Sequence, residues 1–215
     1  MSRGFIDGEY QDGELRGLTF LGGKRGMGKT TEMIRLVSLC SGGVVFFDTL
    51  SKHEGVLRGW VIVTQPRELK KALEKNYGGK FRICYQPRCG NLDEHFAAVC
   101  DVVKIVGWMI FAVDELDKLC GTRFGESRMC AGFYGLVNYG RHHRVSMLAT
   151  ARRPAQVPRG YTSECHEMRL FKLTEKRDLD YFAELIGSEA DKLPSLPPYK
   201  FMYWDDVDGA RIPAR

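Results

Sequence analysis

The feature that most constrains this chain is a glycine-rich stretch near its beginning, which fits G-x-x-x-x-G-K-T from Gly23 to Thr30. Glycines accept positive φ angles, so such a stretch can turn its backbone N–H groups inward around a phosphate. In this motif the lysine, Lys29, contacts the β- and γ-phosphates, and the hydroxyl of Thr30 binds Mg²⁺. The predicted ligands are therefore ATP and Mg²⁺. The residues expected to bind the nucleotide are Gly23, Lys24, Arg25, Gly26, Met27, Gly28, Lys29, Thr30 and Thr31.

The surroundings of this phosphate loop support the prediction. An apolar run at 18–21 precedes it, and apolar residues at helical spacing follow it, from Met33 to Val37. A strand, a loop and a helix in this order direct the positive end of the helix dipole at the bound phosphate. A glycine-rich turn with a surface lysine is the alternative interpretation, and it does not account for the flanking elements.

The rest of the chain alternates between apolar runs of strand length and stretches of helical periodicity. This alternation is typical of an α/β fold with a mostly parallel central sheet flanked by helices. Strands are expected at 18–21, 44–47, 60–63, 81–85, 108–113, 145–150, 168–173 and 200–204, and helices at 29–41, 66–77, 91–104, 129–139 and 175–187. We expect one domain over residues 17–206, preceded by a flexible arm (1–16) and followed by a short C-terminal tail (207–215).

Two adjacent carboxylates, Asp114 and Glu115, end the most apolar of these runs. Ionised carboxylates are costly beside an apolar core, so their position needs a functional reason. In a phosphate-loop enzyme the first acid supports Mg²⁺ and the second activates the attacking water. Asp114 is therefore a candidate metal ligand and Glu115 a candidate general base for hydrolysis. Asp48, which ends the run at 44–47, ranks second because Thr49 rather than an acid follows it.

The segment from 141 to 163 contains five arginines and no acidic residue. A run of one charge sign over this length predicts an anionic partner, either the phosphates in a neighbouring subunit's site or a nucleic-acid backbone. Thr150 ends the expected strand within this segment, so we predict that it senses the γ-phosphate. The arginines are Arg141, Arg144, Arg152, Arg153 and Arg159.

Net charge and hydropathy narrow the choice of function only modestly. The formal net charge of +5 permits a nucleic-acid partner without requiring one. The longest apolar stretch, 105–113, is about half of what a membrane-spanning helix needs, so no membrane span is expected. The N/T-K-x-D tetrapeptide that GTPases use to read their base does not occur.

Four stretches resemble the FtsK–HerA superfamily of DNA-pumping ATPases. The first, GLVNYGRHHRVSMLATARRP (135–154), is similar to the place where a G-R pair in that superfamily precedes a strand ending A-T-Q-R-P. The second, at 167–187, resembles the following strand and helix. The loop RGMGKTT and the late strand at 199–205 are most similar to viral genome-packaging ATPases and their zonula-occludens-toxin-like relatives. These relatives carry a membrane span, so its expected absence here favours packaging.

This resemblance implies a RecA-like core, a ring of five or six copies, and active sites between subunits. It also implies that the ring moves double-stranded DNA with the energy of ATP and loads it into a preformed capsid, in contact with capsid-vertex or portal-like proteins. Arg141 is the best match for an arginine supplied to a neighbouring subunit, with Arg169 and Arg153 as further candidates. One departure is Ala151, which stands where the superfamily has its sensor glutamine.

The expected location is the host cytoplasm, the virion or both. Two other functions stay open at this stage. A P-loop kinase would transfer phosphate to a small metabolite, and a nucleotide-gated phage assembly protein would change partners with little turnover.

Overall fold

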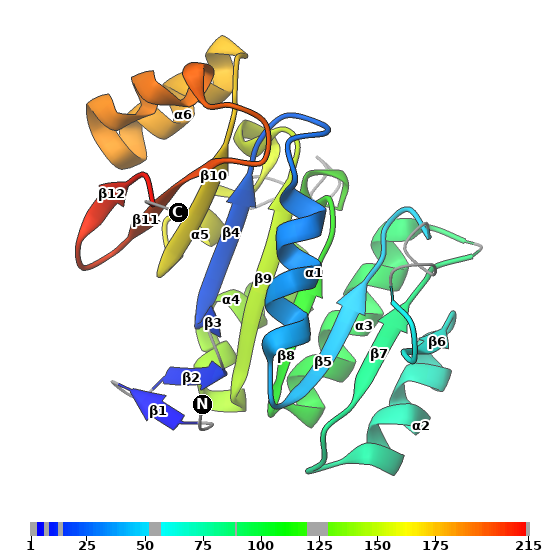
Figure 1. Cartoon of the computed structure of the whole chain (residues 1–215). Helices are drawn as coiled ribbons and strands as arrows, with labels where there is room; N and C mark the ends of the chain where they lie inside the picture. The colour runs from blue at the N-terminus through cyan, green and yellow to red at the C-terminus, as the bar shows by residue number, and fades with distance from the viewer. Residues whose placement is uncertain are drawn as a thin grey trace.

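The structure is a computed structural model, and it describes residues 4–6, 9–12, 15–51, 57–88, 90–119 and 129–213 (Figure 1). Most of these residues belong to a nine-stranded sheet in the order β12-β11-β10-β4-β9-β8-β5-β7-β6. The run from β10 to β6 is parallel, and β11 and β12 continue it antiparallel at one edge. The strands are β4 (Leu18–Gly22), β5 (Gly43–Phe47), β6 (Val61–Val63), β7 (Arg82–Tyr85), β8 (Met109–Val113), β9 (Val145–Ala151), β10 (Glu167–Phe171), β11 (Phe201–Asp205) and β12 (Gly209–Arg211).

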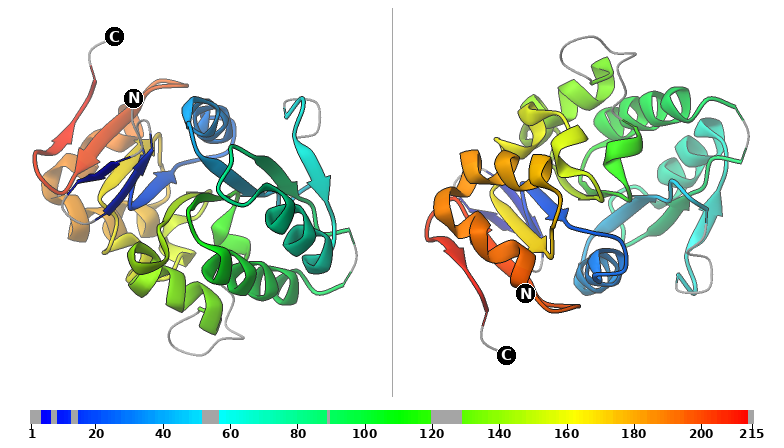
Figure 2. Two further views of the ribbon diagram at one scale, coloured as in Figure 1. Left: turned by 90° about the horizontal axis from the view of Figure 1, so that it is seen from below. Right: turned by 90° about the horizontal axis from the view of Figure 1, so that it is seen from above.

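Helices cover the two faces of this sheet unequally (Figure 2). One face is covered by α1, whose apolar side packs on the sheet through Met33, Leu36 and Val37. The other helices pack their apolar residues into a larger cluster on the opposite face. The helices are α1 (Lys29–Leu39), α2 (Pro66–Asn76), α3 (Leu92–Val106), α4 (Ala131–Tyr139), α5 (Arg159–Thr162) and α6 (Lys176–Ile186), with single-turn or irregular 3₁₀ segments η1 (Leu116–Lys118), η3 (Gly140–His143), η4 (Pro154–Gln156) and η5 (Gly187–Ser195).

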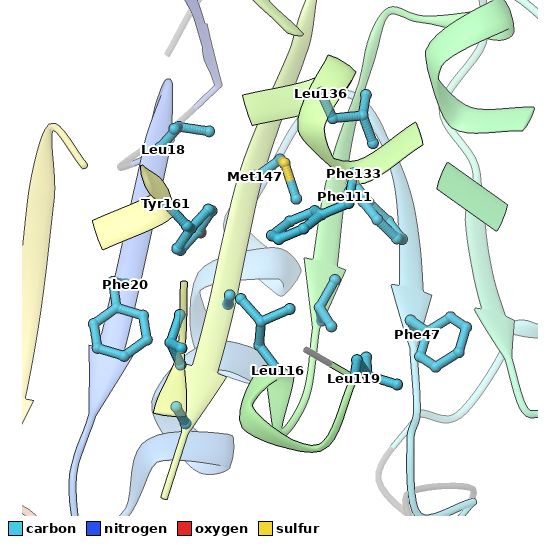
Figure 3. Close-up of a cluster of buried hydrophobic side chains, with 14 of the residues drawn as sticks. Leu18, Phe20, Phe47, Phe111, Leu116, Leu119, Phe133, Leu136, Met147 and Tyr161 are labelled. Carbon is cyan, nitrogen blue, oxygen red and sulfur yellow. The ribbon is translucent and has the colours of Figure 1, made fainter. Parts of the chain in front are cut away.

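The larger cluster explains why the central strands are apolar along their whole length. Every residue of β4, β8 and β9 is buried, because helices cover both faces of the sheet there. Figure 3 shows part of this cluster, where Phe111 and Met147 from the sheet meet Phe133 of α4. The ring of Tyr161 lies 5.8 Å from that of Phe133 and closes the cluster beside β4. This packing fixes the strands whose ends form the site.

The strand order brings three carboxyl ends together. β9 lies between β4 and β8, with Leu21 opposite Thr150 and Val113 opposite Ala149. In a parallel sheet the loops that leave these ends lie at one edge, which is where open α/β sheets bind their ligands. The phosphate loop, the acidic pair and the two arginines after β9 therefore meet at the carboxyl ends of β4, β8 and β9. We call this end of the sheet the carboxyl edge, and the opposite end, where these strands begin, the amino edge.

The predicted fold class is confirmed, and all eight expected strands and five expected helices are present within a few residues of their predicted bounds. Three features were not expected. Residues 209–211, placed in the tail, form β12 and pair with β11. The segment taken as a flexible arm contains β1 (Gly4–Ile6), β2 (Glu9–Asp12) and β3 (Leu15–Arg16), which form a separate antiparallel sheet. The short helix α5 follows β9. The domain limits at 17 and 206 stay a prediction.

Among the described residues, none of the helices combines the length and the apolar character that crossing a membrane requires.

Candidate active site at the carboxyl edge of the sheet

The phosphate loop connects β4 to α1 and is anchored at its base by the two neighbouring strands. The backbone N of Gly23 donates to Ala151 O (3.2 Å), and that of Lys24 donates to Lys172 O (2.9 Å). Gly26 and Gly28 have φ angles of +78° and +104°, which favour glycine over other residues. Lys24, Arg25 and Gly26 are exposed at the crest of the loop. The loop thus has the backbone geometry that the sequence motif predicts.

Lys29 begins α1 and is buried beneath this loop, with 6% of its surface exposed. Its Nζ donates to Lys24 O (3.0 Å), inside the loop. Burial lowers the pKa of Lys29 to about 8, and the nearby carboxylates of Asp114, Asp117 and Glu115 oppose part of that shift. A positive charge that is incompletely neutralised in this enclosed place suits an anionic ligand.

Thr30, the next residue, links the phosphate loop to the acidic strand end. Its Oγ1 donates to Asp114 Oδ1 over 3.3 Å. The same carboxylate oxygen accepts a hydrogen bond of 2.6 Å from Thr150 Oγ1 on β9. Asp114 is almost fully buried, and Thr49 donates its hydroxyl to the Asp114 carbonyl. The carboxylate is therefore held at the amino end of α1.

The oxygens of Thr30 and Asp114 suit Mg²⁺, and the phosphate loop beside them suits the phosphates of ATP. A hydroxyl and a carboxylate in contact are hard oxygen donors of the kind Mg²⁺ prefers. Mg²⁺ typically takes one or two protein oxygens, with nucleotide phosphates and waters as its other ligands. The described part of the chain contains no cluster of three or more His, Cys, Asp or Glu side chains that could hold a metal by itself. Thr30 and Asp114 would hold Mg²⁺, and the phosphate loop would hold the phosphates.

Glu115 directly follows Asp114 but has a different environment. Its backbone is left-handed, with φ 53° and ψ 54°, and its N–H donates to Thr150 Oγ1 (2.9 Å). A left-handed conformation is uncommon for a residue with a side chain and is often found at functional sites. The carboxylate pairs with Lys118 and lies 3.5 Å from Arg152 Nη1. The bend at Glu115 thus turns the second acid away from the first, toward the arginines after β9.

Thr150 is where the sequence placed it, at the end of β9 beside the acidic pair. Its hydroxyl donates a hydrogen bond to the Asp114 carboxylate and accepts one from the Glu115 N–H. The side chain is fully buried. In this arrangement Thr150 positions both acids, and its predicted contact with the γ-phosphate stays a prediction.

Asp117 is a site residue that the sequence did not point to. Its carboxylate accepts the backbone N–H groups of Arg152 and Arg153, both at 3.2 Å. Burial raises the pKa of Asp117. Asp117 therefore ties the loop after β8 to the loop after β9. Its spacing two residues after Glu115 was a possible signal, but only the adjacency of β8 and β9 gives it meaning.

A pocket of about 400 Å³ opens beside the phosphate loop. Cationic side chains from two loops, Lys24 and Arg25 on one and Arg152 and Arg153 on the other, line one part of it. The rest is lined by Leu173, Thr174 and Glu175, from the connection of β10 to α6, and by Asp178 of α6. Arg153 pairs with Glu175 and Arg152 with Glu115, so two of the four cations are already paired within the chain.

The other two arginines with a predicted role lie elsewhere. Arg141 is exposed in η3, before the amino end of β9, so a whole strand of seven residues separates it from the phosphate loop of its own chain. Arg169 lies in β10 with 5% of its surface exposed and pairs with Glu32 of α1. Its Nη2 is 3.6 Å from Glu167 Oε1. No observation tests the catalytic roles of these residues, and they stay predictions.

The arginine-rich segment is not one surface. Arg144 lies over the ring of Trp108 (5.6 Å) at the amino end of β9. Arg159 on α5 pairs with Glu184 of α6. Acidic residues distant in sequence therefore balance several of these charges, and the anionic partner expected for the segment stays a prediction. The second-ranked acid, Asp48, is fully buried and accepts a hydrogen bond from Gln86 Nε2 (3.1 Å).

Comparison with known proteins identifies the fold. No known family profile matches the sequence, and no curated protein sequence matches it. The genome packaging NTPase B204 from Sulfolobus turreted icosahedral virus 2, solved with ATP-gammaS, is similar in structure (TM-score 0.71, 15% identity, 92% of this chain and 96% of that chain). VirB4 of Thermoanaerobacter pseudethanolicus is also similar (TM-score 0.62, 11% identity, 93% of this chain and 90% of that chain).

The cytoplasmic domain of the Type VII secretion ATPase EccC from Thermomonospora curvata matches 94% of this chain with 24% of its own length (TM-score 0.52, 11% identity). These neighbours are P-loop ATPases of the FtsK–HerA type, as the sequence resemblance implied. At such identities the similarity concerns the fold. This chain therefore has the fold of these solved NTPases and ATPases, a large and mostly parallel sheet flanked by helices.

Proposed function

We propose that this protein hydrolyses ATP at the carboxyl edge of its sheet and uses the energy to move double-stranded DNA into a viral capsid. The observation that carries the hydrolytic part is the chain of contacts from Thr30 through Asp114 and Thr150 to Glu115. It joins the phosphate-binding helix to a pair of acids with different environments. A second acid directly after a metal ligand could accept a proton from water, and this favours hydrolysis over transfer to a metabolite.

Each residue in this site has a defined task. The loop from Gly23 to Gly28 binds phosphates through its N–H groups, and Lys29 balances their charge. Thr30 and Asp114 hold Mg²⁺, which would neutralise phosphate charge when bound. Glu115 accepts the proton of the attacking water, and Thr150 keeps both acids in place.

The DNA part of the proposal draws on two observations. The neighbour B204 is described as a genome packaging NTPase, and the similarity extends over nearly the whole of both chains. The net charge of +5 and the exposed cations Lys24 and Arg25 are compatible with an anionic polymer. Capsid-vertex or portal-like proteins would be the further partners, in the host cytoplasm or in the virion.

The position of Arg141 supports the proposal that the protein forms a ring of subunits. Arg141 is exposed at the amino edge, too far along β9 to reach its own phosphate loop, so it can contribute to hydrolysis only in a neighbouring subunit. We therefore propose a pentamer or hexamer in which Arg141 completes the next site, with Arg153 and Arg169 as the other candidates. Both are ion-paired within the chain, but Arg169 is also buried whereas Arg153 is exposed, so Arg169 is the weaker candidate.

The test is ATP hydrolysis measured with and without double-stranded DNA at low salt, together with mass from light scattering in the presence of nucleotide. We expect DNA to stimulate hydrolysis and nucleotide to promote a ring, and we expect Lys29→Ala and Glu115→Gln to abolish stimulated hydrolysis. Equal rates with and without DNA, with no DNA binding, would refute translocation. Phosphate appearing on a small acceptor would favour a kinase, and partner binding with negligible turnover would favour an assembly protein.

A further inference from the structure

Tyr199 lies against the phosphate loop although it is about 170 residues away in the sequence. It follows η5 and precedes β11, in the segment Pro197–Lys200. Its backbone N donates to Met27 O (3.1 Å), which fixes this segment to the loop. Its ring is so close to Gly28 that a Cβ built on that glycine would lie 2.8 Å from Tyr199 Cδ1. The ring and the last glycine of the phosphate loop are therefore in direct contact.

Two properties of Tyr199 are unusual for a packing residue. Its side chain is largely solvent-exposed, with 60% of the residue surface accessible. Its backbone is left-handed, with φ +61°, a conformation that costs on the order of 1 kcal/mol or more for a bulky residue. Neither property is explained by burial of the ring in the core. An exposed aromatic ring held in a strained conformation beside a ligand loop is typical of a binding residue.

The position of the ring relative to α1 defines what it can contact. The phosphates would lie inside the loop, above Lys29 at the amino end of α1. Tyr199 approaches from the side of β10 and β11, where Phe171 also reaches Gly28 (3.5 Å from the built Cβ). A nucleotide bound by its phosphates must place its ribose and base outside the loop, and the exposed Tyr199 ring is an aromatic surface beside the last glycine of that loop.

We propose that Tyr199 is the base-stacking residue of the nucleotide site. This inference rests on the proposed nucleotide binding and deepens it by assigning the contact for the base. Base–aromatic stacking tolerates every base, because each base has a flat π-face. Tyr199 therefore gives affinity without selecting the base, and we expect ATP and GTP to bind with affinities within about threefold of each other.

The experiment compares ATP with inorganic tripolyphosphate, which offers phosphates but no base, each with Mg²⁺, as ligands of the full chain. Tyr199→Gly removes the ring and suits the positive φ angle, so it is expected to fold. We expect it to weaken ATP binding by about tenfold and to leave tripolyphosphate binding unchanged. Tyr199→Phe and Tyr199→Trp keep a flat ring and are expected to bind ATP nearly as wild type does.

The matched control is Tyr77→Gly, which removes another exposed tyrosine at the end of α2, and it should change neither ligand. Unchanged ATP binding by Tyr199→Gly would overturn the stacking role. An equal loss of both ligands would also overturn it, because Tyr199 would then support the loop and not the base. If the wild-type protein binds neither ligand, the nucleotide site itself is refuted. If the wild-type protein binds both ligands and Lys29→Ala binds neither, the nucleotide site stands, and the result for Tyr199→Gly then concerns Tyr199 alone.

Discussion

The carboxyl edge and the amino edge of the parallel sheet differ in how their charged side chains are arranged. At the carboxyl edge, Lys29, Asp114 and Thr150 are buried and contact one another or the loop within one chain. At the amino edge, Arg141 is exposed and Arg144 lies over the Trp108 ring. Burying charged groups is costly unless they are paired, so the carboxyl edge is organised in advance for a ligand. The amino edge presents its charge outward, as a surface that serves another molecule does.

Among the variants that test this comparison, Arg141→Ala has the largest expected effect on ATP hydrolysis. If Arg141 completes a neighbour's site, kcat should fall by about 1000-fold or more. ATP binding should change little, because the phosphate loop of the same chain is intact. Hydrolysis assays should also show that mixing Arg141→Ala with Lys29→Ala restores part of the activity, since some interfaces then join an intact loop to an intact arginine.

The control for this experiment is Arg144→Ala, which removes the neighbouring arginine of the same edge and should have a much smaller effect. An Arg141→Ala protein with normal kcat, or an inactive mixture, would show that the amino edge does not act on a neighbour.

A second prediction concerns the acid that the bend at Glu115 turns toward Arg152. Glu115→Gln removes the proton acceptor, so kcat should fall by about 100- to 10000-fold while ATP stays bound. Single-turnover hydrolysis and equilibrium binding separate the two effects. Glu175→Gln, at the same edge and paired with Arg153, is the control. Hydrolysis that persists in Glu115→Gln would assign the base to another residue.

Thr150 tests how the carboxyl edge is organised. Thr150→Val keeps the shape but removes the hydroxyl that joins Asp114 to the Glu115 N–H. The unpaired groups should lower the free energy of unfolding by about 1–3 kcal/mol. Lost positioning should lower kcat by about 10- to 100-fold, as for other supporting residues, and Thr150→Ser should restore it. If the variant instead loses its preference for ATP over ADP with kcat unchanged, Thr150 senses the γ-phosphate directly.

The smallest effect is a dependence of binding on pH. The pKa of Lys29 is lowered to about 8 in the free protein, so Lys29 loses its proton as pH rises through that value. Bound phosphates favour the protonated form, so binding at about pH 8.5 should take up on the order of half a proton or more, and affinity should fall as pH increases. Calorimetry in buffers of different ionisation enthalpy measures the uptake. Lys29→Arg, which stays charged, should show none, and equal uptake in both proteins would contradict the assignment.

Much of the carboxyl edge can be predicted from the sequence, whereas little of the amino edge can. Continuous apolar runs reveal the strands, and the spacing of Gly23, Lys29 and Thr30 reveals the loop, because both patterns are local. The role of Asp117 depends on β8 and β9 being neighbours, which no local pattern contains. The position of Tyr199 likewise depends on a contact with a loop far away in the chain.

The arginine-rich segment shows the same limit of local patterns. Its composition predicts an anionic partner, but it does not reveal that Arg153 and Arg159 pair with Glu175 and Glu184, which come from later in the chain. The strand β9 also places Arg141 and Arg152 at its opposite ends. Charge patterns along a sequence describe a surface only when the fold keeps those residues on one side.

The central claim is that each chain binds one Mg²⁺–ATP at the carboxyl edge, through the loop ending at Lys29 and the carboxylate of Asp114. Titration of a fluorescent ATP analogue, with Mg²⁺ or with EDTA, tests it on wild type, Lys29→Ala and Asp114→Asn. We predict one site per chain, at least about tenfold weaker binding in Lys29→Ala, and loss of the Mg²⁺ dependence alone in Asp114→Asn. Binding that is the same in all three proteins would contradict the account.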